Sequence, residues 1–197
     1  MYFNIFRYYA LELCLSSLDK LFLPDGHASK YSGPAIPSDL TVLLELAFGL
    51  EYIHSRQLAH RDIKPDNVLI ALEAENTGRS QQVVMKWADF GLSKPVNERG
   101  TYSMSGFRGN LCWMAPELLN ALDLEDQGVA ASNDMENEEN QAQRGNIKSD
   151  VFAAGCVFGY YLLRGTHPYG SRRVEIQNNI TNNILKNLPS EYNNYVY

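Results

Sequence analysis

The segment 60–67 carries three side chains that can act together, the carboxylate of Asp62, the ammonium group of Lys64 and the amide of Asn67. Phosphoryl transfer needs a carboxylate beside the attacking hydroxyl and hard oxygen ligands for Mg²⁺, all held by a stiff loop. Pro65 stiffens this segment because its ring fixes the backbone angle φ. A lone His-Arg-Asp triplet is most often a surface turn, but the lysine and asparagine at fixed offsets favour a phosphoryl-transfer site.

Two further motifs follow in order. The triplet Asp89-Phe90-Gly91 comes 27 residues after Asp62, and a predicted hairpin lies between them. Asp-Phe-Gly alone is a common turn, so its weight comes from its order and spacing. The triplet Ala115-Pro116-Glu117 then closes a segment with several hydroxyl side chains. These hydroxyls belong to Thr101, Tyr102, Ser103 and Ser105.

The three motifs, in this order, resemble the signature of the eukaryotic protein kinase family. The resemblance implies transfer of phosphate from ATP, with Mg²⁺, to a protein substrate, and Lys64 at its position is typical of serine/threonine kinases. It also implies an activation loop, in which Arg61 would meet a phosphate added to one of the four hydroxyls. A kinase of small molecules is less favoured, because an activation segment and Ala-Pro-Glu are features of protein kinases.

The resemblance also implies roles for single residues. Asp62 would accept or orient the proton of the substrate hydroxyl, and Lys64 would neutralise charge on the moving phosphoryl group. Asn67 and Asp89 would hold Mg²⁺, with Asp89 bridging the phosphates of ATP. These four side chains are the candidate catalytic and metal-binding residues.

Several neighbouring residues would support this site. By the same resemblance, Phe90 would pack against the core of the lobe, and Gly91 would give the chain freedom to turn. Asp150 would brace the backbone of the catalytic loop. Asn110 stands where most serine/threonine kinases have a threonine that reaches the catalytic carboxylate.

Within the family, the nearest likeness is to the inositol-requiring kinase/endoribonucleases, the sensors of the unfolded-protein response. It covers most of residues 8–170 and depends on the stretches 10–14, 109–117, 150–158 and 165–170. It implies that backbone groups of Glu12 and Cys14 bind the adenine of ATP and that Leu11 is the gatekeeper. It also implies a longer protein in the endoplasmic reticulum membrane, with this part on the cytosolic face, acting on a protein substrate or on a second copy of itself.

Part of the family pattern is not found in these 197 residues. Kinases bind ATP between two lobes, and the smaller lobe supplies a Gly-rich loop and a strand lysine, whereas residues 1–14 contain neither lysine nor glycine. The chain alone is therefore expected to turn over little or no ATP. Two interpretations stay open, a portion of a working kinase and a catalytically inactive lobe that acts as an interaction module. Glu117 is expected to be unpaired, or paired with Arg172 or Arg173.

The elements that must position these residues follow from the apolar pattern. The expected fold is α+β, a mostly α-helical C-terminal kinase lobe with a small β-hairpin and with most of the N-terminal lobe absent. Ser38 is the expected N-cap of a helix over 40–54. The residues expected on its buried face are Leu40, Leu43, Leu44, Ala47 and Leu50. The other expected elements are one or two buried strands in 1–14, a short helix at 17–22, strands at 68–70 and 83–87, a helix from Leu118, a helix buried on all sides at 151–163 and a weaker helix at 172–185.

One stretch is expected to lack regular structure. Residues 123–140 contain seven acidic side chains and neither lysine nor arginine. Such a stretch buries too little apolar surface to offset the entropy of ordering. We therefore expect a partial kinase domain over 1–197 that contains an acidic, disordered insert at 123–146.

Composition excludes several other classes. The net charge of −6 argues against a nucleic-acid-binding surface, which needs clustered lysine and arginine. The cysteines Cys14, Cys112 and Cys156 form no close pair, so a disulfide framework or a zinc site is not indicated and a reducing compartment fits best. Neither a membrane-spanning apolar run nor a signal peptide is present, so the chain is expected to be cytoplasmic.

Overall fold

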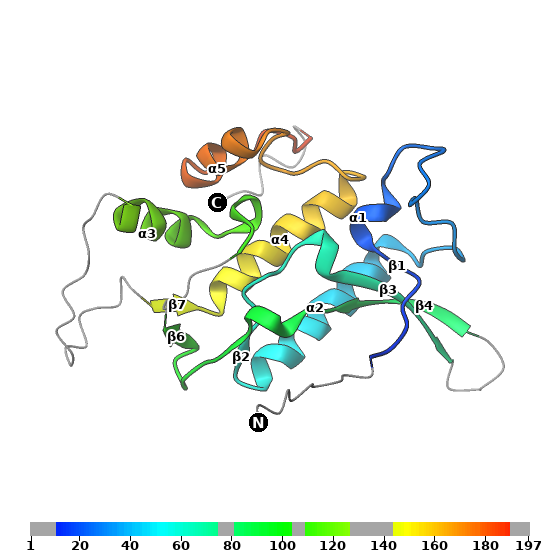
Figure 1. Ribbon diagram of the computed structural model, residues 1–197, viewed down its shortest axis with the longest axis horizontal. Helices are drawn as coiled ribbons and strands as arrows, with labels where there is room; N and C mark the ends of the chain where they lie inside the picture. The colour runs from blue at the N-terminus through cyan, green and yellow to red at the C-terminus, as the bar shows by residue number, and fades with distance from the viewer. Residues whose placement is uncertain (1–10, 75–80, 104–108, 127–143, 190–197) are drawn as a thin grey trace, which may run out of the picture.

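The computed structural model describes residues 11–74, 81–103, 109–126 and 144–189, and these form an α+β architecture (Figure 1). The helices are α1 (Leu18–Leu21), α2 (Asp39–Ser55), α3 (Pro116–Asp126), α4 (Lys148–Leu162) and α5 (Arg173–Thr181). Three short 3-10 helices are η1 (Pro65–Asn67), η2 (Phe90–Leu92) and η3 (Leu111–Trp113). The strands are β1 (Ser16–Ser17), β2 (Leu58–Ala59), β3 (Val68–Ala74), β4 (Gln81–Trp87), β5 (Lys94–Pro95), β6 (Thr101–Ser103) and β7 (Arg144–Asn146).

The expected hairpin is formed by β3 and β4. The two strands pair antiparallel, with Val68 opposite Trp87 and Ala74 opposite Gln81, and β1 adds a third strand on the free edge of β3. Because β3 starts directly after Asn67 and β4 ends two residues before Asp89, the antiparallel register brings these two side chains to the same end of the hairpin. The prediction of a hairpin between the motifs is confirmed, with longer strands than expected.

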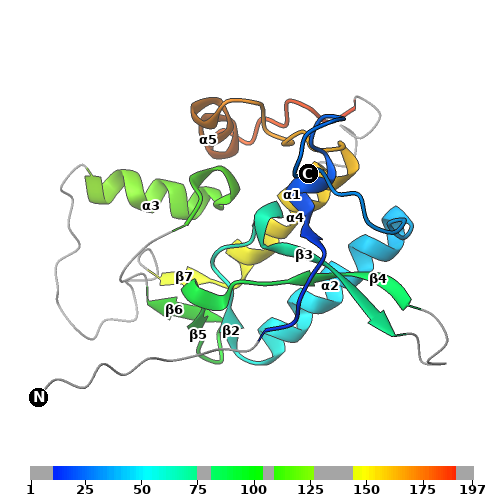
Figure 2. The ribbon, with the colours of Figure 1, turned by 45° about the vertical axis from the view of Figure 1, so that its right-hand side comes forward.

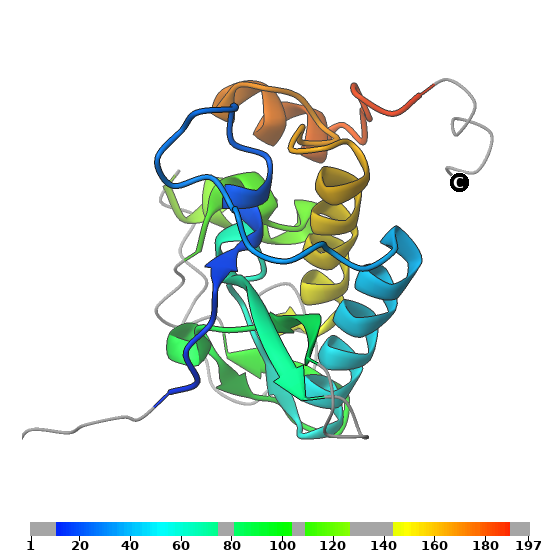
Figure 3. The same ribbon diagram turned by 90° about the vertical axis from the view of Figure 1, so that its right-hand side faces the viewer.

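Two apolar clusters form the core. In the first, α2 and α4 pack beside the hairpin (Figure 3), and the indole Nε1 of Trp87 donates a hydrogen bond to the carbonyl of Leu46 at 2.8 Å. In the second, α5 packs on η3 and α3, at the end of the molecule away from the hairpin (Figure 2). The first cluster fixes the loop that precedes β3, and the second fixes the segment around η3.

Helix α2 confirms the expected helix but only part of its expected buried face. Ser38 caps the helix, because its hydroxyl oxygen accepts a hydrogen bond from the backbone N–H of Thr41. The residues that are buried are Val42, Leu46, Leu50 and Ile53. Leu50 is buried and Leu43 packs against the core as expected, whereas Leu40, Leu44 and Ala47 are exposed, so the predicted face was wrong in part. The helix carries apolar residues on two sides, and contacts with β4 and α4 decide which side is buried.

Three other expectations were wrong in part. Residues 11–14 form no strand, and Leu11 and Leu13 are exposed, because no described strand pairs with them. Helix α4 is not buried on all sides, since Val151 and Leu162 are about half exposed. Helix α5 ends at Thr181 rather than Leu185, because Asn183 adopts a left-handed conformation (φ 53°), which asparagine tolerates at the end of a helix.

The ends of the expected acidic insert carry secondary structure. Residues 123–126 belong to α3, which starts at Pro116 rather than Leu118, and residues 144–146 form β7. Strand β7 pairs antiparallel with β6. Residues 127–143 lie outside the described residues. In the part of the chain that the structure describes, no helix has the length and hydropathy needed to cross a bilayer.

Two glycines of α4 give a matched test of its packing. A methyl group at Gly159 would lie 2.4 Å from Cγ of Pro168, whereas one at Gly155 would meet no atom within 4 Å. Alanine favours a helix over glycine by about 1 kcal/mol. We expect Gly155→Ala to raise the free energy of unfolding by about 0.5–1 kcal/mol and Gly159→Ala to lower it, as measured by urea denaturation. Equal shifts for both variants would contradict the packing of α4 against Pro168.

Candidate active site

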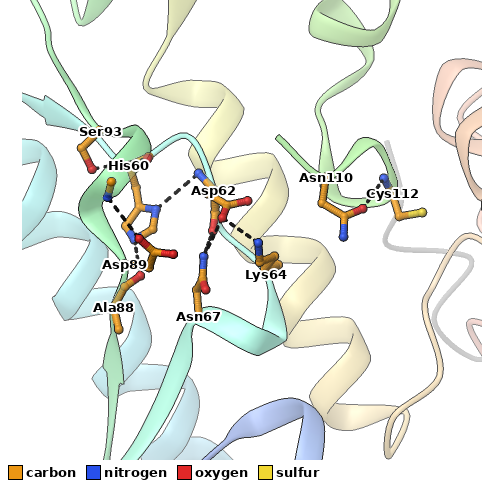
Figure 4. A network of polar contacts seen from close by, with 10 residues as sticks. His60, Asp62, Lys64, Asn67, Ala88, Asp89, Ser93, Asn110 and Cys112 are labelled. Carbon is orange, nitrogen blue, oxygen red and sulfur yellow. Dashed lines mark hydrogen bonds and ion pairs between the residues drawn. The ribbon is translucent and has the colours of Figure 1, made fainter. Parts of the chain in front are cut away.

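Asp62, Lys64 and Asn67 converge in the loop before β3 (Figure 4). Lys64 Nζ lies 2.6 Å from Oδ2 of Asp62, and the side-chain amide of Asn67 donates to the same oxygen and to the Asp62 carbonyl, at 2.8 Å each. Asp62 is buried, with 8% of its surface exposed. Both described donors use Oδ2, so Oδ1 accepts no hydrogen bond from a described residue. One carboxylate oxygen is thus fixed and the other is available to a ligand.

His60 connects this loop to the start of the second motif. Its Nδ1 accepts a hydrogen bond from the backbone N–H of Asp62 at 3.3 Å, so the proton sits on Nε2, which donates to the Ala88 carbonyl at 2.9 Å. Burial lowers the pKa of His60, which favours this neutral form. The backbone N–H of Ala88 also donates to the Asn67 carbonyl at 2.9 Å. Asp89, the next residue, is therefore held beside Asn67.

Asp89 is exposed, and it is the residue of the Asp89-Phe90-Gly91 triplet that has a positive φ. Its φ of 62° is left-handed, and its Oδ1 accepts a hydrogen bond from the N–H of Gly91 at 3.2 Å. The expectation that Gly91 supplies the turn was wrong, because Asp89 has the positive φ and stabilises it through its own side chain. Phe90 is 47% exposed and touches the ring of His60, with centroids 5.0 Å apart, so it packs on the loop rather than inside the core.

Asp150 braces the catalytic loop as the sequence predicted. One carboxylate oxygen accepts a hydrogen bond from the backbone N–H of His60 at 2.7 Å, and the other accepts from that of Arg61 at 2.8 Å. His54 Nε2 lies 3.0 Å from the first of these oxygens. Because Asp150 lies in the first turn of α4, this contact fixes the loop to that helix.

The donor set fits Mg²⁺ bound together with phosphates. Mg²⁺ prefers oxygen ligands and is commonly held by one or two carboxylates plus substrate phosphates. Asp89 offers an exposed carboxylate, and the amide nitrogen of Asn67 is already bonded to Asp62, which leaves the amide oxygen to act as a ligand. No cluster of three or more His, Cys, Asp or Glu suited to a metal occurs among the described residues, so phosphate oxygens would have to complete the coordination.

The described part of the expected activation loop shows how accessible three of the four candidate hydroxyls are. Tyr102 is buried under the guanidinium of Arg61, whose Cζ lies 5.2 Å from the ring centroid, and burial raises the pKa of Tyr102 to about 12. Thr101 is partly buried, Ser103 is exposed, and Ser105 lies outside the described residues. Arg61 donates from Nη1 to the Leu92 carbonyl at 3.2 Å.

The side chains of Asn110 and Glu117 both accept hydrogen bonds from described residues. The side-chain oxygen of Asn110 accepts a hydrogen bond from the N–H of Cys112 at 3.1 Å and so caps η3, instead of contacting the Asp62 carboxylate. Glu117 accepts a hydrogen bond from the hydroxyl of Ser149 at 2.8 Å rather than pairing with an arginine. The first contact is local to η3, and the second joins α3 to α4.

The segment expected to bind adenine runs along the hairpin. The N–H of Leu15 donates to the Ile70 carbonyl at 2.7 Å, and the Glu12 carboxylate lies 2.9 Å from Nζ of Lys86 on β4. Cys14 is partly buried, and burial raises the pKa of its thiol. Leu11, the expected gatekeeper, is 86% exposed. The roles of Glu12 and Cys14 toward adenine stay predictions.

An open hollow beside Asp62 and Lys64 includes residues that the sequence did not indicate. The other residues that line it are Leu92, Gly109, Asn110, Leu111, Cys112, Arg173 and Gln177. Arg173 is 111 residues from Asp62 in the sequence, and no motif marks it. Only the folding of α5 onto η3 brings it to this site.

The family model described as "Protein kinase domain" matches residues 38–195, and the chain belongs to the protein kinase family. It is 33% identical over 181 residues to the serine/threonine-protein kinase/endoribonuclease ireA of Aspergillus fumigatus, a match that covers 83% of this chain. It is 37% identical over 168 residues to the serine/threonine-protein kinase/endoribonuclease IRE2 of Homo sapiens, and 31% identical over 173 residues to the sensor for unfolded proteins in the ER ire1 of Schizosaccharomyces pombe, each covering 84% of this chain.

The matched regions span 15% of the length of each of these relatives. The predicted resemblance to the inositol-requiring kinase/endoribonucleases is thereby confirmed.

Proposed function

We propose that this chain is the C-terminal lobe of a serine/threonine kinase that transfers the γ-phosphate of ATP to serine or threonine side chains of proteins. The observation that carries the proposal is the arrangement of Asp62. One oxygen of its buried carboxylate is fixed by Lys64 and Asn67, the other accepts no hydrogen bond from a described residue, and Asp62 lines a hollow open to solvent. A carboxylate in this state can orient a substrate hydroxyl without changing its own position.

Each residue of the site then has a defined task. Asp62 accepts a hydrogen bond from the substrate hydroxyl through Oδ1, and it receives the proton as the hydroxyl oxygen bonds to the γ-phosphorus and the bond from that phosphorus to ADP breaks. Lys64 carries a positive charge next to the reacting groups, and this charge opposes the negative charge that develops on the phosphoryl oxygens. Asn67 and Asp89 supply oxygen ligands for Mg²⁺. Bound Mg²⁺–ATP supplies the phosphoryl group and neutralises charge on its phosphates.

The nucleotide would lie on the hairpin side of the site. We propose that backbone groups of Glu12 and Cys14 hydrogen-bond the adenine. The contact between Glu12 and Lys86 supports this, because it holds the segment against β4. Asp150 has a positioning role, since it binds the catalytic loop through backbone N–H groups and does not touch the reacting atoms.

We further propose a place for the longer protein in the unfolded-protein response. The names of the relatives support this, because one is a sensor for unfolded proteins in the ER and others are kinase/endoribonucleases. The kinase part would then lie on the cytosolic face of the endoplasmic reticulum membrane. Its substrate would be another protein or the activation loop of a second copy.

A second candidate function is a non-catalytic lobe that acts as an interaction module. Asn110 favours it, because this side chain caps η3 and does not reach the Asp62 carboxylate. The lack of lysine and glycine in residues 1–14 means that the 197-residue chain alone is expected to turn over little ATP under either proposal. The two proposals therefore differ only in the intact protein.

The test is phosphate transfer by the intact protein purified from its source. With γ-labelled ATP and Mg²⁺, the label is expected on serine or threonine of a protein substrate or of the protein itself, and chelation of Mg²⁺ is expected to abolish the transfer. Stable binding of partners with no transfer under these conditions would favour the interaction module.

A further inference from the structure

The hollow beside Asp62 has one wall that the proposed chemistry does not use. Arg173 and Gln177 of α5 form this wall, and Asp62 and Lys64 line the same hollow. Two residues four apart lie on the same face of a helix, so both side chains share one direction. Helix α5 is held in place by Ile176 and Ile180, which are buried in the cluster around η3. The wall is thus a fixed part of the lobe.

The charges in the hollow do not balance. The Asp62 carboxylate is compensated by Lys64 at 2.6 Å. Arg173 is exposed, and no hydrogen bond or ion pair joins it to another residue within the ranges that the structure describes. It is close enough to Cys112 to lower the pKa of that thiol in part, against the larger effect of burial. The α5 wall of the hollow therefore presents a guanidinium that no carboxylate of the described residues pairs with.

The position of Arg173 relates it to the protein substrate rather than to the nucleotide. The hollow is lined by Asn110, Leu111 and Cys112, and it includes neither Asn67 nor Asp89. Figure 4 shows Asn110 and Cys112 on the other side of Lys64 from Asp89. A ligand that reached Arg173 would thus extend from Asp62 away from the proposed Mg²⁺ ligands.

We propose that Arg173 is a specificity-determining residue, which selects substrate segments with an acidic side chain within a few residues of the hydroxyl that is phosphorylated. This inference depends on the proposed kinase function. A guanidinium binds a carboxylate with two parallel hydrogen bonds, so it discriminates by charge and by geometry. Gln177 adds an amide on the same face, and Leu111 adds an apolar surface that is 39% exposed.

The experiment measures peptide binding to the complete 197-residue chain by fluorescence anisotropy. The probes are two labelled peptides with one serine in an alanine and asparagine background, flanked by glutamate in one and by lysine in the other. The glutamate peptide is expected to bind about threefold to tenfold more tightly than the lysine peptide, and the preference is expected to weaken in high salt. Arg173→Gln is expected to remove the preference, and Arg173→Glu is expected to reverse it.

Arg172→Glu is the matched control. Arg172 is the adjacent residue, is also exposed and does not line the hollow. The control should keep most of the preference for glutamate, although it changes the net charge as much as Arg173→Glu does. Equal effects of the two charge reversals, or no preference in the unchanged chain, would overturn the proposal.

Failure of this inference can be distinguished from failure of the proposed function. The binding assay needs no phosphate transfer. If the intact protein transfers no phosphate but the 197-residue chain still prefers the acidic peptide through Arg173, only the kinase function is rejected. Transfer that is equally fast to acidic and basic substrates, together with binding insensitive to Arg173→Glu, would reject only the role of Arg173.

Discussion

Replacing Asp62 by asparagine is expected to lower the rate of phosphate transfer by the intact protein about 10²- to 10⁴-fold. The amide has nearly the same shape as the carboxylate, so the contact with Asn67 can be kept in part. It cannot take the proton of the substrate hydroxyl, and it does not compensate the charge of Lys64. The loss is therefore expected in the maximal rate, with little change in the concentration of ATP needed for half-maximal rate.

Asp66→Asn is the matched control for this prediction. Asp66 is the same residue type in the same loop, but its side chain is exposed. It does not line the hollow, and it takes no part in the hydrogen bonds around His60. We expect the rate of this variant to stay within about threefold of the unchanged protein. Similar losses in both variants would show that the loop is sensitive to charge in general, and would count against a specific task for Asp62.

Asp150→Ala is expected to lower the free energy of unfolding of the chain by roughly 2–5 kcal/mol. Asp150 is 4% exposed, and its two oxygens accept hydrogen bonds from the backbones of His60 and Arg61. Truncation leaves both N–H groups without a partner and opens the contact with His54. Denaturation by urea, followed by tryptophan fluorescence, measures the change because Trp87 and Trp113 both lie in the core clusters.

Two further variants separate this bracing role from a general effect of charge. Asp25→Ala removes a carboxylate whose side chain is 99% exposed and paired only with Lys30, so its effect on stability should be close to zero. Asp150→Asn keeps one acceptor oxygen and should lose an intermediate amount. A loss for Asp150→Ala no larger than that for Asp25→Ala would be incompatible with the bracing contacts.

The arrangement of the site was predictable where it depends on local order. The hairpin could be foreseen from two apolar runs separated by a polar turn, and its antiparallel register brings Asn67 and Asp89 together. The capping role of Ser38 follows from its residue type and its position before an apolar helix. Such features need only residues that are close in sequence.

The features that were missed depend on contacts between distant segments. Helix α2 has apolar residues on two sides, and its periodicity alone could not tell that Leu46 rather than Leu44 meets the core. Arg173 reaches the hollow only because the residues after it are buried against η3. The freedom to turn was expected at Gly91 rather than at Asp89, since glycine is the usual residue for a positive φ and the supporting bond from the Asp89 side chain is not visible in a motif.

The central claim is that Asn67 and Asp89 hold a divalent metal next to Asp62. Paramagnetic broadening of backbone and side-chain amide signals by Mn²⁺, added with ATP in place of Mg²⁺, tests it most directly. We predict broadening of the Asn67 side-chain amide and of the Asp89 and Phe90 backbone signals at low Mn²⁺, and its loss in Asp89→Asn. Broadening confined to the acidic residues 123–140, and unchanged by Asp89→Asn, would contradict the account.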